Sequence, residues 1–127
     1  MDKKIKILIV ALFLIGIGAY LYISANSYDT MIEVTSSPKL KNGESFSVIL
    51  KDKYRNVYPN EVINVKILDD SGWANYFNAT TDETGQASVL LKGMENGNYT
   101  VHANFNGTLF LHKSKSVNSL EINDGMN

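Results

Sequence analysis

Two short acidic pairs are the residues whose chemistry the sequence lets us weigh first. Asp69-Asp70 and Asp82-Glu83 flank the segment around Trp73, and we expect them to approach each other at one end of the fold. Grouped carboxylates can hold Ca²⁺, which takes six or more oxygen ligands. Neither pair has the spaced D-x-D-x-D-G pattern of a calcium loop, and paired catalytic carboxylates need a cleft that solvated turns rarely supply. The pattern therefore favours neither a calcium site nor a glycosidase, and we expect no catalytic residue.

Histidine and cysteine give little support for a metal site or a nucleophile. His102 and His112 are the two histidines of the chain, and no cysteine is present. The absence of cysteine excludes disulfides, thiolate zinc sites and cysteine nucleophiles. Alternation places His102 on the polar side of a strand, and we expect both histidines to face solvent. We expect neither a bound metal nor another cofactor.

Aromatic side chains are better candidates for contacts with a partner. Trp73 and Phe77 share one face of a short strand, and we expect both rings to fill the core. Tyr76 lies on the opposite face, and Tyr54 and Tyr58 lie in a polar loop. A tyrosine ring can stack on a sugar or pack on a protein while its hydroxyl stays wet. Tyr54, Tyr58 and Tyr76 are therefore the candidate surface contacts.

Three asparagines stand in N-x-S/T acceptor sequences for N-glycosylation. They are Asn78, Asn98 and Asn106. Strand alternation points Asn98 and Asn106 away from the core, so we expect them to be accessible. A chain rich in Asn and Thr also produces such sequences by chance, so a mass shift on the native protein is the test.

Beyond residue 28, apolar and polar residues alternate as in half-buried strands. Phe46, Val48 and Leu50 show the pattern clearly. The same period recurs in three further segments: 62–67, 86–92 and 99–106. Weaker patterns cover four others: 30–36, 73–78, 108–112 and 116–122. Asn-Gly, Ser-Gly and Thr-Gly pairs separate these segments as tight turns do, which predicts a two-layer antiparallel sandwich.

The beginning of the chain has the pattern of a membrane anchor. Lys3, Lys4 and Lys6 precede an uncharged apolar run of 17 residues, 7–23. That run is about 26 Å long as a helix, against about 30 Å of hydrocarbon in a bilayer. Because the positive charges come first, we expect the N-terminus in the cytoplasm and the rest outside the cell. The alternative is a secreted chain cleaved near Ala25, which the length of the run disfavours.

These patterns divide the chain into five parts. They are a cytoplasmic tail (1–6), a transmembrane signal-anchor helix (7–24), a linker (25–29), the β-sandwich (30–123) and a C-terminal tail (124–127). Without the first six residues and the helix, the net charge is about −3 and both signs are interspersed. No basic stripe is present, so nucleic acid is not an expected partner. A small secreted domain without disulfides is most typical of prokaryotes.

The second half of the strand pattern resembles a known family of repeats. Residues 81–87, TDETGQA, and 97–107, GNYTVHANFNG, are similar to the prokaryotic Ig-like (Big-type) repeats of archaeal and bacterial surface adhesin-like proteins, above all those of methanogens. The resemblance covers about residues 30–123. It implies a tyrosine corner at Tyr99, whose hydroxyl would bond back to the backbone, and turn roles for Gly85, Gly97 and Gly107.

Together, the patterns and the resemblance predict an all-β protein with a single Ig-like antiparallel β-sandwich of seven to eight strands, preceded by one N-terminal transmembrane helix. The resemblance implies a non-enzymatic adhesion or structural binding role at the cell surface. The expected partners are the membrane, through the helix, and a surface protein or cell-wall polymer. Two alternatives stay open: an accessory subunit of a membrane or surface-filament assembly, and a cell-wall polysaccharide-binding module.

Overall fold

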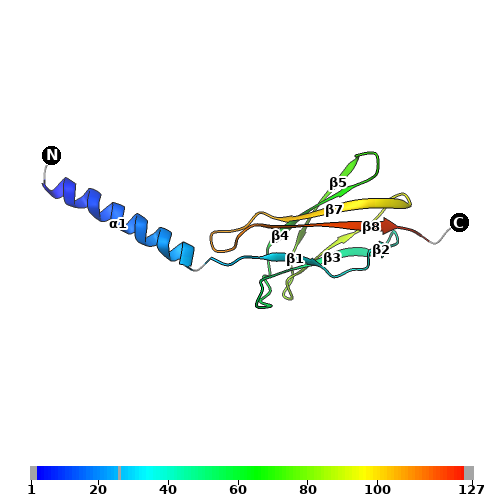
Figure 1. Cartoon of the computed structure of the whole chain (residues 1–127), viewed down its shortest axis with the longest axis horizontal. Helices are drawn as coiled ribbons and strands as arrows, with labels where there is room; N and C mark the ends of the chain where they lie inside the picture. Colours follow the sequence, from blue (N-terminus) through cyan, green and yellow to red (C-terminus); the bar gives the residue numbers. More distant parts are fainter. Residues whose placement is uncertain (1–2, 26, 125–127) are drawn as a thin grey trace.

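In the computed structural model, one helix precedes eight β-strands. The structure describes residues 3–25 and 27–124. In chain order the elements are α1 (Lys3–Ala25), β1 (Met31–Val34), β2 (Lys39–Leu40), β3 (Ser45–Lys51), β4 (Val62–Leu68), β5 (Ala74–Thr80), β6 (Gln86–Leu90), β7 (Gly97–Phe105) and β8 (Ser114–Ile122). The helix projects from one end of the strands, so the molecule is elongated (Figure 1).

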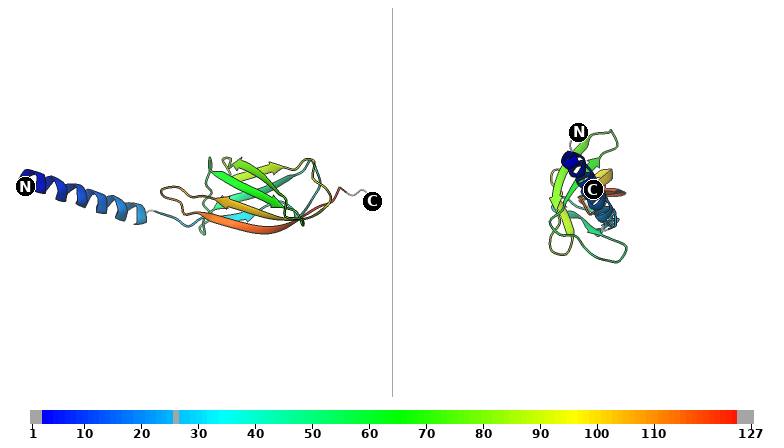
Figure 2. Two further views of the ribbon diagram at one scale, coloured as in Figure 1. Left: turned by 90° about the horizontal axis from the view of Figure 1, so that it is seen from above. Right: turned by 90° about the vertical axis from the view of Figure 1, so that its left-hand side faces the viewer.

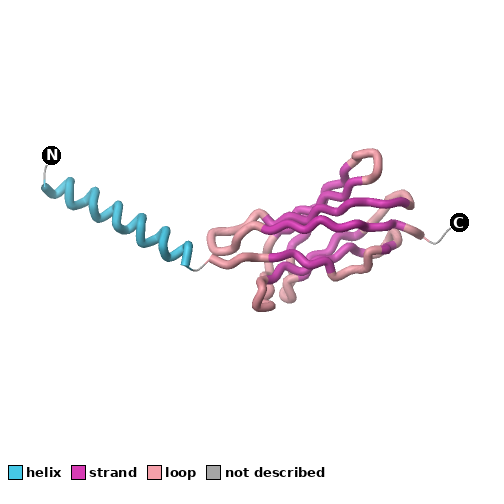
Figure 3. Tube along the Cα trace, in the orientation of Figure 1, coloured by secondary structure: helices cyan, strands magenta, loops and turns pink. Residues whose placement is uncertain are grey.

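The strands form two sheets that pack against each other. One sheet has three strands in the order β1-β3-β6, and the other has five in the order β2-β8-β7-β4-β5. Figure 2 shows these layers from two further sides, and Figure 3 separates strands from loops. The predicted all-β sandwich with one N-terminal apolar helix is confirmed.

Alternation along the strands places one side of each sheet in the core. On β4, Ile63, Val65 and Ile67 are buried, and on β7 Val101 and Ala103 are buried. Further buried side chains of the core are Ile32, Leu40, Phe46, Val48, Leu50, Ala79, Ala87, Val89, Leu91, Met94, Phe105, Leu120 and Ile122. Removal of this apolar surface from water is the main driving force for folding, and the chain has no disulfide to add to it.

The first strand of the sandwich is divided between the two sheets. β1 pairs antiparallel with β3, whereas β2 pairs in parallel with β8. Pro38 lies between the two halves, and its carbonyl accepts a hydrogen bond of 2.8 Å from the Glu121 N–H. The parallel pair of β2 and β8 is a detail that the sequence does not predict within the antiparallel sandwich. A strand of two residues is too short to show an alternation in sequence.

One weak strand prediction is wrong. Residues 108–112 form no strand; they lie in the loop between β7 and β8, where Leu111 makes an isolated parallel bridge with Tyr28. Gly107, with φ +86°, turns the chain two residues after Phe105, where β7 and its pairing with β8 end.

The loops group at two ends of the sandwich. The helix end carries the β3–β4 loop (52–61), the β5–β6 turn (81–85) and the β7–β8 loop (106–113), because α1 leads into β1 on that side. The far end carries the β4–β5 turn (69–73) and the β6–β7 loop (91–96). Figure 1 shows the β4–β5 hairpin projecting at the far end.

The helix is exposed over residues 3–22. Its 23 residues correspond to about 35 Å. By length and composition, Lys3–Ile23 can cross a membrane, and no part of it is buried against the sandwich. Within the predicted linker, Ser27 donates a side-chain hydrogen bond to the carbonyl of Ile23, and Tyr28 pairs with the β7–β8 loop. Residue 26 lies outside the described residues.

Candidate functional site: the outer face of the five-stranded sheet

The solvent side of the five-stranded sheet, which we call the outer face, is the candidate functional site. Its side chains come from the strand positions that alternate with the core residues. Cross-strand register aligns them in rows, because directly paired residues point to the same side of a sheet. The amide row consists of Asn78, Asn64, Asn104 and Lys115, on β5, β4, β7 and β8. The aromatic row beside it consists of Tyr76, Lys66, His102 and Val117.

The amide row borders a depression suited to polar ligands. The depression has a volume of about 530 Å³, and Asn64, Asn104, Asn106, Lys113 and Lys115 contribute to its lining. Each asparagine amide offers two N–H donors and one carbonyl acceptor, and each lysine offers only donors. Adjacent strands lie about 4.8 Å apart, so a row of four residues extends about 14 Å. This arrangement can bind a flat array of hydroxyl, amide or carboxylate groups.

Tyr76 gives the outer face an exposed ring. Its side chain is 74% exposed, and Lys66 Nζ lies 5.9 Å from the ring centroid. A cation over an aromatic ring is attracted to its face, which helps to orient the lysine stem along the sheet. Tyrosine combines an apolar ring with a polar hydroxyl, a combination common in adaptable binding surfaces.

The other two candidate tyrosines lie away from Tyr76, in the β3–β4 loop at the helix end. Tyr54 is 67% exposed, and Lys53 Nζ lies 5.1 Å from its ring centroid. Tyr58 is only partly exposed, packs against the core and donates a hydrogen bond of 2.7 Å to Asp52 Oδ2. The three tyrosines therefore do not form a single contact surface.

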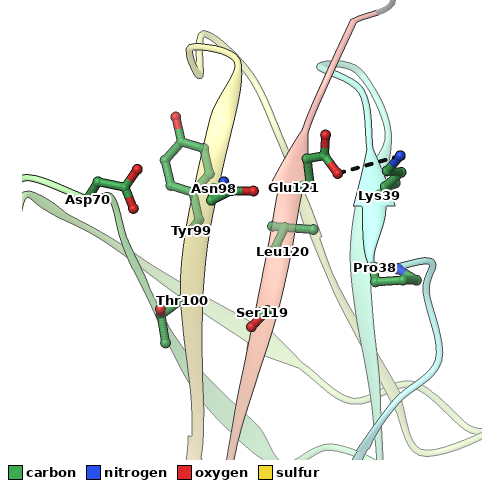
Figure 4. A pocket seen from close by; sticks show the side chains of 9 residues that line it. All are labelled: Pro38, Lys39, Asp70, Asn98, Tyr99, Thr100, Ser119, Leu120 and Glu121. Atoms are coloured by element: carbon green, nitrogen blue, oxygen red, sulfur yellow. Dashed lines mark ion pairs between the residues drawn. The ribbon is translucent and has the colours of Figure 1, made fainter.

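A shallow groove crosses the far end of the outer face (Figure 4). It has a volume of about 460 Å³. Asn98 and Thr100 on β7 and Ser119 on β8 contribute polar groups to it, and Figure 4 shows Asp70 on one side and the Lys39–Glu121 ion pair on the other. The ion pair has an N–O distance of 3.6 Å and is largely exposed, so it contributes little stability.

Tyr99 stands beside this groove and has the geometry of a tyrosine corner. Its hydroxyl donates a hydrogen bond of 2.6 Å to the carbonyl of Glu95, four residues upstream in the β6–β7 loop. Burial raises the pKa of the Tyr99 hydroxyl, and the negative charges of Asp69 and Glu95 raise it further. The hydroxyl therefore stays protonated and attaches the loop to the start of β7.

Asp52 organises the β3–β4 loop, a role that the sequence analysis missed. Its Oδ1 accepts hydrogen bonds from the backbone N–H groups of Tyr54 and Asn56, and its Oδ2 accepts from the side chains of Asn56 and Tyr58. Burial alone would raise the pKa of Asp52, but these four hydrogen bonds outweigh it and lower the pKa to about 2. Burial and the hydrogen bond to Asp52 raise the pKa of Tyr58 to about 12.

The two acidic pairs do not meet, which corrects the expectation of a shared end. Asp69 lies in the β4–β5 turn at the far end, and Asp82 lies in the β5–β6 turn at the helix end, with the whole of β5 between them. Each carboxylate caps its own turn, through N–H groups two and four residues ahead. Among residues 3–25 and 27–124, no group of three or more histidine or acidic side chains is placed to hold a metal ion.

Two of the predicted turn glycines are required by close packing. A Cβ on Gly85, where φ is +78°, would lie 2.7 Å from Val57 Cβ and 3.0 Å from the Leu50 carbonyl oxygen. A Cβ on Gly107, where φ is +86°, would lie 2.9 Å from the Leu111 carbonyl oxygen. Gly97 is the first residue of β7 and has open space around it.

The three acceptor asparagines are all exposed. Asn78 lies on the outer face in β5, and Asn98 lies near the start of β7, beside the groove. Asn106 follows β7 in the β7–β8 loop and borders the depression. A glycan on any of them would cover part of the outer face or its margin.

The prediction that Trp73 fills the core is wrong. Its side chain is 76% exposed, because β5 begins only at Ala74 and Trp73 belongs to the projecting β4–β5 turn. The Trp73 carbonyl accepts a hydrogen bond of 3.0 Å from the Asp69 N–H, which closes the turn. Phe77, inside the strand, is partly buried and packs against the core as expected.

Comparisons with known proteins support the fold. No protein-family model and no curated protein matches the sequence. Among solved structures, the chain is similar to a crystal structure of a tetra-tandem repeat from the extending region of a large adhesion protein, with a TM-score of 0.53 and 16% sequence identity. The match covers 76% of this chain and 24% of that one. At this identity the similarity establishes a shared sandwich fold.

Proposed function

We propose that this chain is a membrane-anchored module at the cell surface with a non-enzymatic adhesion or structural binding role, and that it binds through the outer face. The observation that carries the proposal is the amide row. It crosses four strands on the solvent side of the sheet, and the exposed ring of Tyr76 lies beside it. A structural sheet face needs no such concentration of amides and an exposed ring. The sandwich fold shared with an adhesion-protein repeat supports a role in binding.

The helix supports anchoring rather than a place in the core. Beyond the lysines of its first turn it is apolar, and it is long enough to cross a bilayer. Lys3, Lys4 and Lys6 precede the apolar segment, and by the positive-inside rule this order supports a sandwich outside the cell. Cleavage near Ala25 would release the same sandwich as a secreted module. The more specific relation to methanogen repeats stays a prediction from the sequence.

A capture experiment with matched variants tests the outer face. The full chain, in detergent micelles, is incubated with isolated cell-envelope polymer and, separately, with a detergent extract of membrane proteins from the encoding organism. We expect the Tyr76→Ala, Asn104→Ala double variant to lose at least about tenfold in capture by one of the two, as central aromatic contacts do in interfaces. Tyr54→Ala, an exposed tyrosine at the helix end, is the control and should be captured like the unaltered chain.

The same experiment separates the adhesion module from the two alternatives. Retention on polymer that depends on Tyr76 and Asn104 supports polymer binding by the outer face. If the polymer is a polysaccharide, the result supports the polysaccharide-binding module. Recovery of a stoichiometric protein complex supports an accessory subunit. That alternative gains some support from β5, a seven-residue strand at the edge of its sheet that can pair with a neighbouring strand. Equal capture of all variants by both materials would refute binding through the outer face.

A further inference from the structure

We propose that the tip of the β7–β8 loop, Leu109 and Phe110, inserts into the outer interface of the bilayer that α1 spans. The sandwich would then stand with its helix end against the lipid surface instead of moving freely on a linker. The inference rests on the membrane anchoring proposed above and adds a second lipid contact to it.

The loop is tied to the chain that leaves the helix. The Tyr28 N–H donates a hydrogen bond of 2.9 Å to the Phe110 carbonyl, and the His112 N–H donates one of 2.9 Å to the Tyr28 carbonyl. The Thr30 hydroxyl adds a bond of 2.7 Å to the His112 carbonyl. The chain after the helix is thus paired with the loop on both sides of Leu111. The tip is therefore held next to the end of α1.

A ring contact sets the depth of the tip. The Phe110 ring packs edge-on against the ring of Tyr22, with centroids 6.1 Å apart and planes at 89°. Tyr22 lies within the last turn of α1, and tyrosines near the end of a membrane helix occupy the headgroup interface. When α1 spans the bilayer, Phe110 lies at the depth of Tyr22.

The tip exposes apolar surface to solvent. Leu109 is 64% exposed and Phe110 is 38% exposed. Lys113 follows in the same loop, and a basic residue behind an apolar tip is typical of segments that sit in a lipid interface. Two side chains are too few for a stable protein interface, which buries about 800 Å² on each partner. A lipid surface already lies beside them, so we assign lipid as the occupant.

The contact would orient the rest of the molecule. The strands continue roughly along the direction of α1 (Figures 1 and 2), so the helix end would face the membrane and the far end, with the β4–β5 turn and the β6–β7 loop, would point away from it. The outer face would then stand upright on the membrane, open to partners from the side.

Single cysteines report depth directly, because the natural chain has none. Leu109→Cys, Val117→Cys and Phe13→Cys are each labelled with the fluorophore NBD in the full chain and placed in phosphatidylcholine nanodiscs, with and without bromines on the acyl chains. Val117 is an exposed apolar residue of the outer face and serves as the matched control. Far-UV circular dichroism verifies that each variant keeps its sheet. We expect brominated lipid to reduce emission at 109 and 13 by about twofold or more, and at 117 hardly at all.

The three labels separate the loop contact from the anchor itself. Quenching at 13 and 109 supports the proposal. Quenching at 13 with an unquenched, water-exposed label at 109 would overturn the loop contact while leaving the anchor intact. An unquenched label at 13 would refute the anchor, and the loop contact with it. A label at 109 shielded from both water and bromine would indicate a protein surface and would also overturn the proposal.

Discussion

Arg55 and Gly85 occupy equivalent positions in two aspartate-capped turns, and both have left-handed backbones, with φ angles of 69° and 78°. Each lies three residues after the capping aspartate and donates its N–H to that aspartate's carbonyl, at 3.2 Å for Arg55 and 2.9 Å for Gly85. The β4–β5 turn repeats the arrangement with Gly72, at φ +90°. Three of the connections between strands thus share one design, and only the β3–β4 loop places a residue with a Cβ where glycine is favoured.

Replacement of Arg55 by glycine should therefore stabilise the sandwich. A positive φ raises the free energy of a residue with a Cβ, whereas glycine adopts it without that penalty. We expect Arg55→Gly to raise the free energy of unfolding by about 0.5–1 kcal/mol. Denaturant unfolding of the full chain in micelles, followed by far-UV circular dichroism, measures the change. Lys53→Gly, at a position without a positive φ, is the control and should lower stability; an equal loss for Arg55→Gly would contradict the account.

Gly85 and Gly72 form a matched pair for substitution, because they share a positive φ and differ in how closely other atoms surround them. Both have positive φ, but a Cβ at Gly72 meets nothing within 4 Å, whereas at Gly85 it meets Val57 and Leu50 at 3.0 Å or less. Gly72→Ala should cost about 1 kcal/mol from the backbone alone. Gly85→Ala should cost at least about 1 kcal/mol more, because the neighbours must also shift. Equal midpoints in denaturant for the two variants would show that the close packing around Gly85 is not maintained.

The stability contributed by the Asp52 carboxylate should depend on pH. The folded-state pKa of Asp52 is lowered to about 2 from an ordinary value of 3.8. A lowered pKa means that the stabilisation is present above the unfolded pKa and is lost as the pH falls toward the folded one. The difference in unfolding free energy between the natural chain and Asp52→Asn should be full near about pH 6 and shrink between about pH 4 and 2. A difference that stays constant over this range would show that the charge is not involved.

Tyr99→Phe tests the tyrosine corner. The substitution removes only the hydroxyl that donates to Glu95, so the loss should be about 1 kcal/mol in unfolding free energy. Tyr76→Phe removes a hydroxyl from an exposed ring and should change stability by less than about 0.5 kcal/mol. If both substitutions have the same small effect, the hydroxyl of Tyr99 does not hold the β6–β7 loop in place.

Strand alternation in the sequence predicts the core well, because period 2 is set by backbone geometry and a half-buried strand has only one apolar side. Ile63, Val65 and Ile67 follow it without exception. The prediction for Trp73 fails because the alternation was extended one residue ahead of the strand, which begins only at Ala74. Tertiary pairing, and not local sequence, decides where a strand begins.

The candidate site was less predictable than the core. The amide row depends on the register between β5, β4, β7 and β8, and a single sequence does not reveal which strands are neighbours. The capping role of Asp52 was hidden because its turn has Arg55 in place of the usual glycine. By contrast, Asp82 and Gly85 lie in a D-x-T-G pattern, which marks a tight turn directly.

Side-selective labelling of single cysteines on intact cells tests the central claim, that the sandwich is anchored outside the membrane. Lys92→Cys places a thiol at the exposed far end of the sandwich, and Lys3→Cys places one at the start of α1. With a membrane-impermeant maleimide, the account predicts that Lys92→Cys is labelled on intact cells and that Lys3→Cys is labelled only after lysis, both in the membrane fraction. Labelling of Lys3→Cys on intact cells with protection of Lys92→Cys would contradict the account.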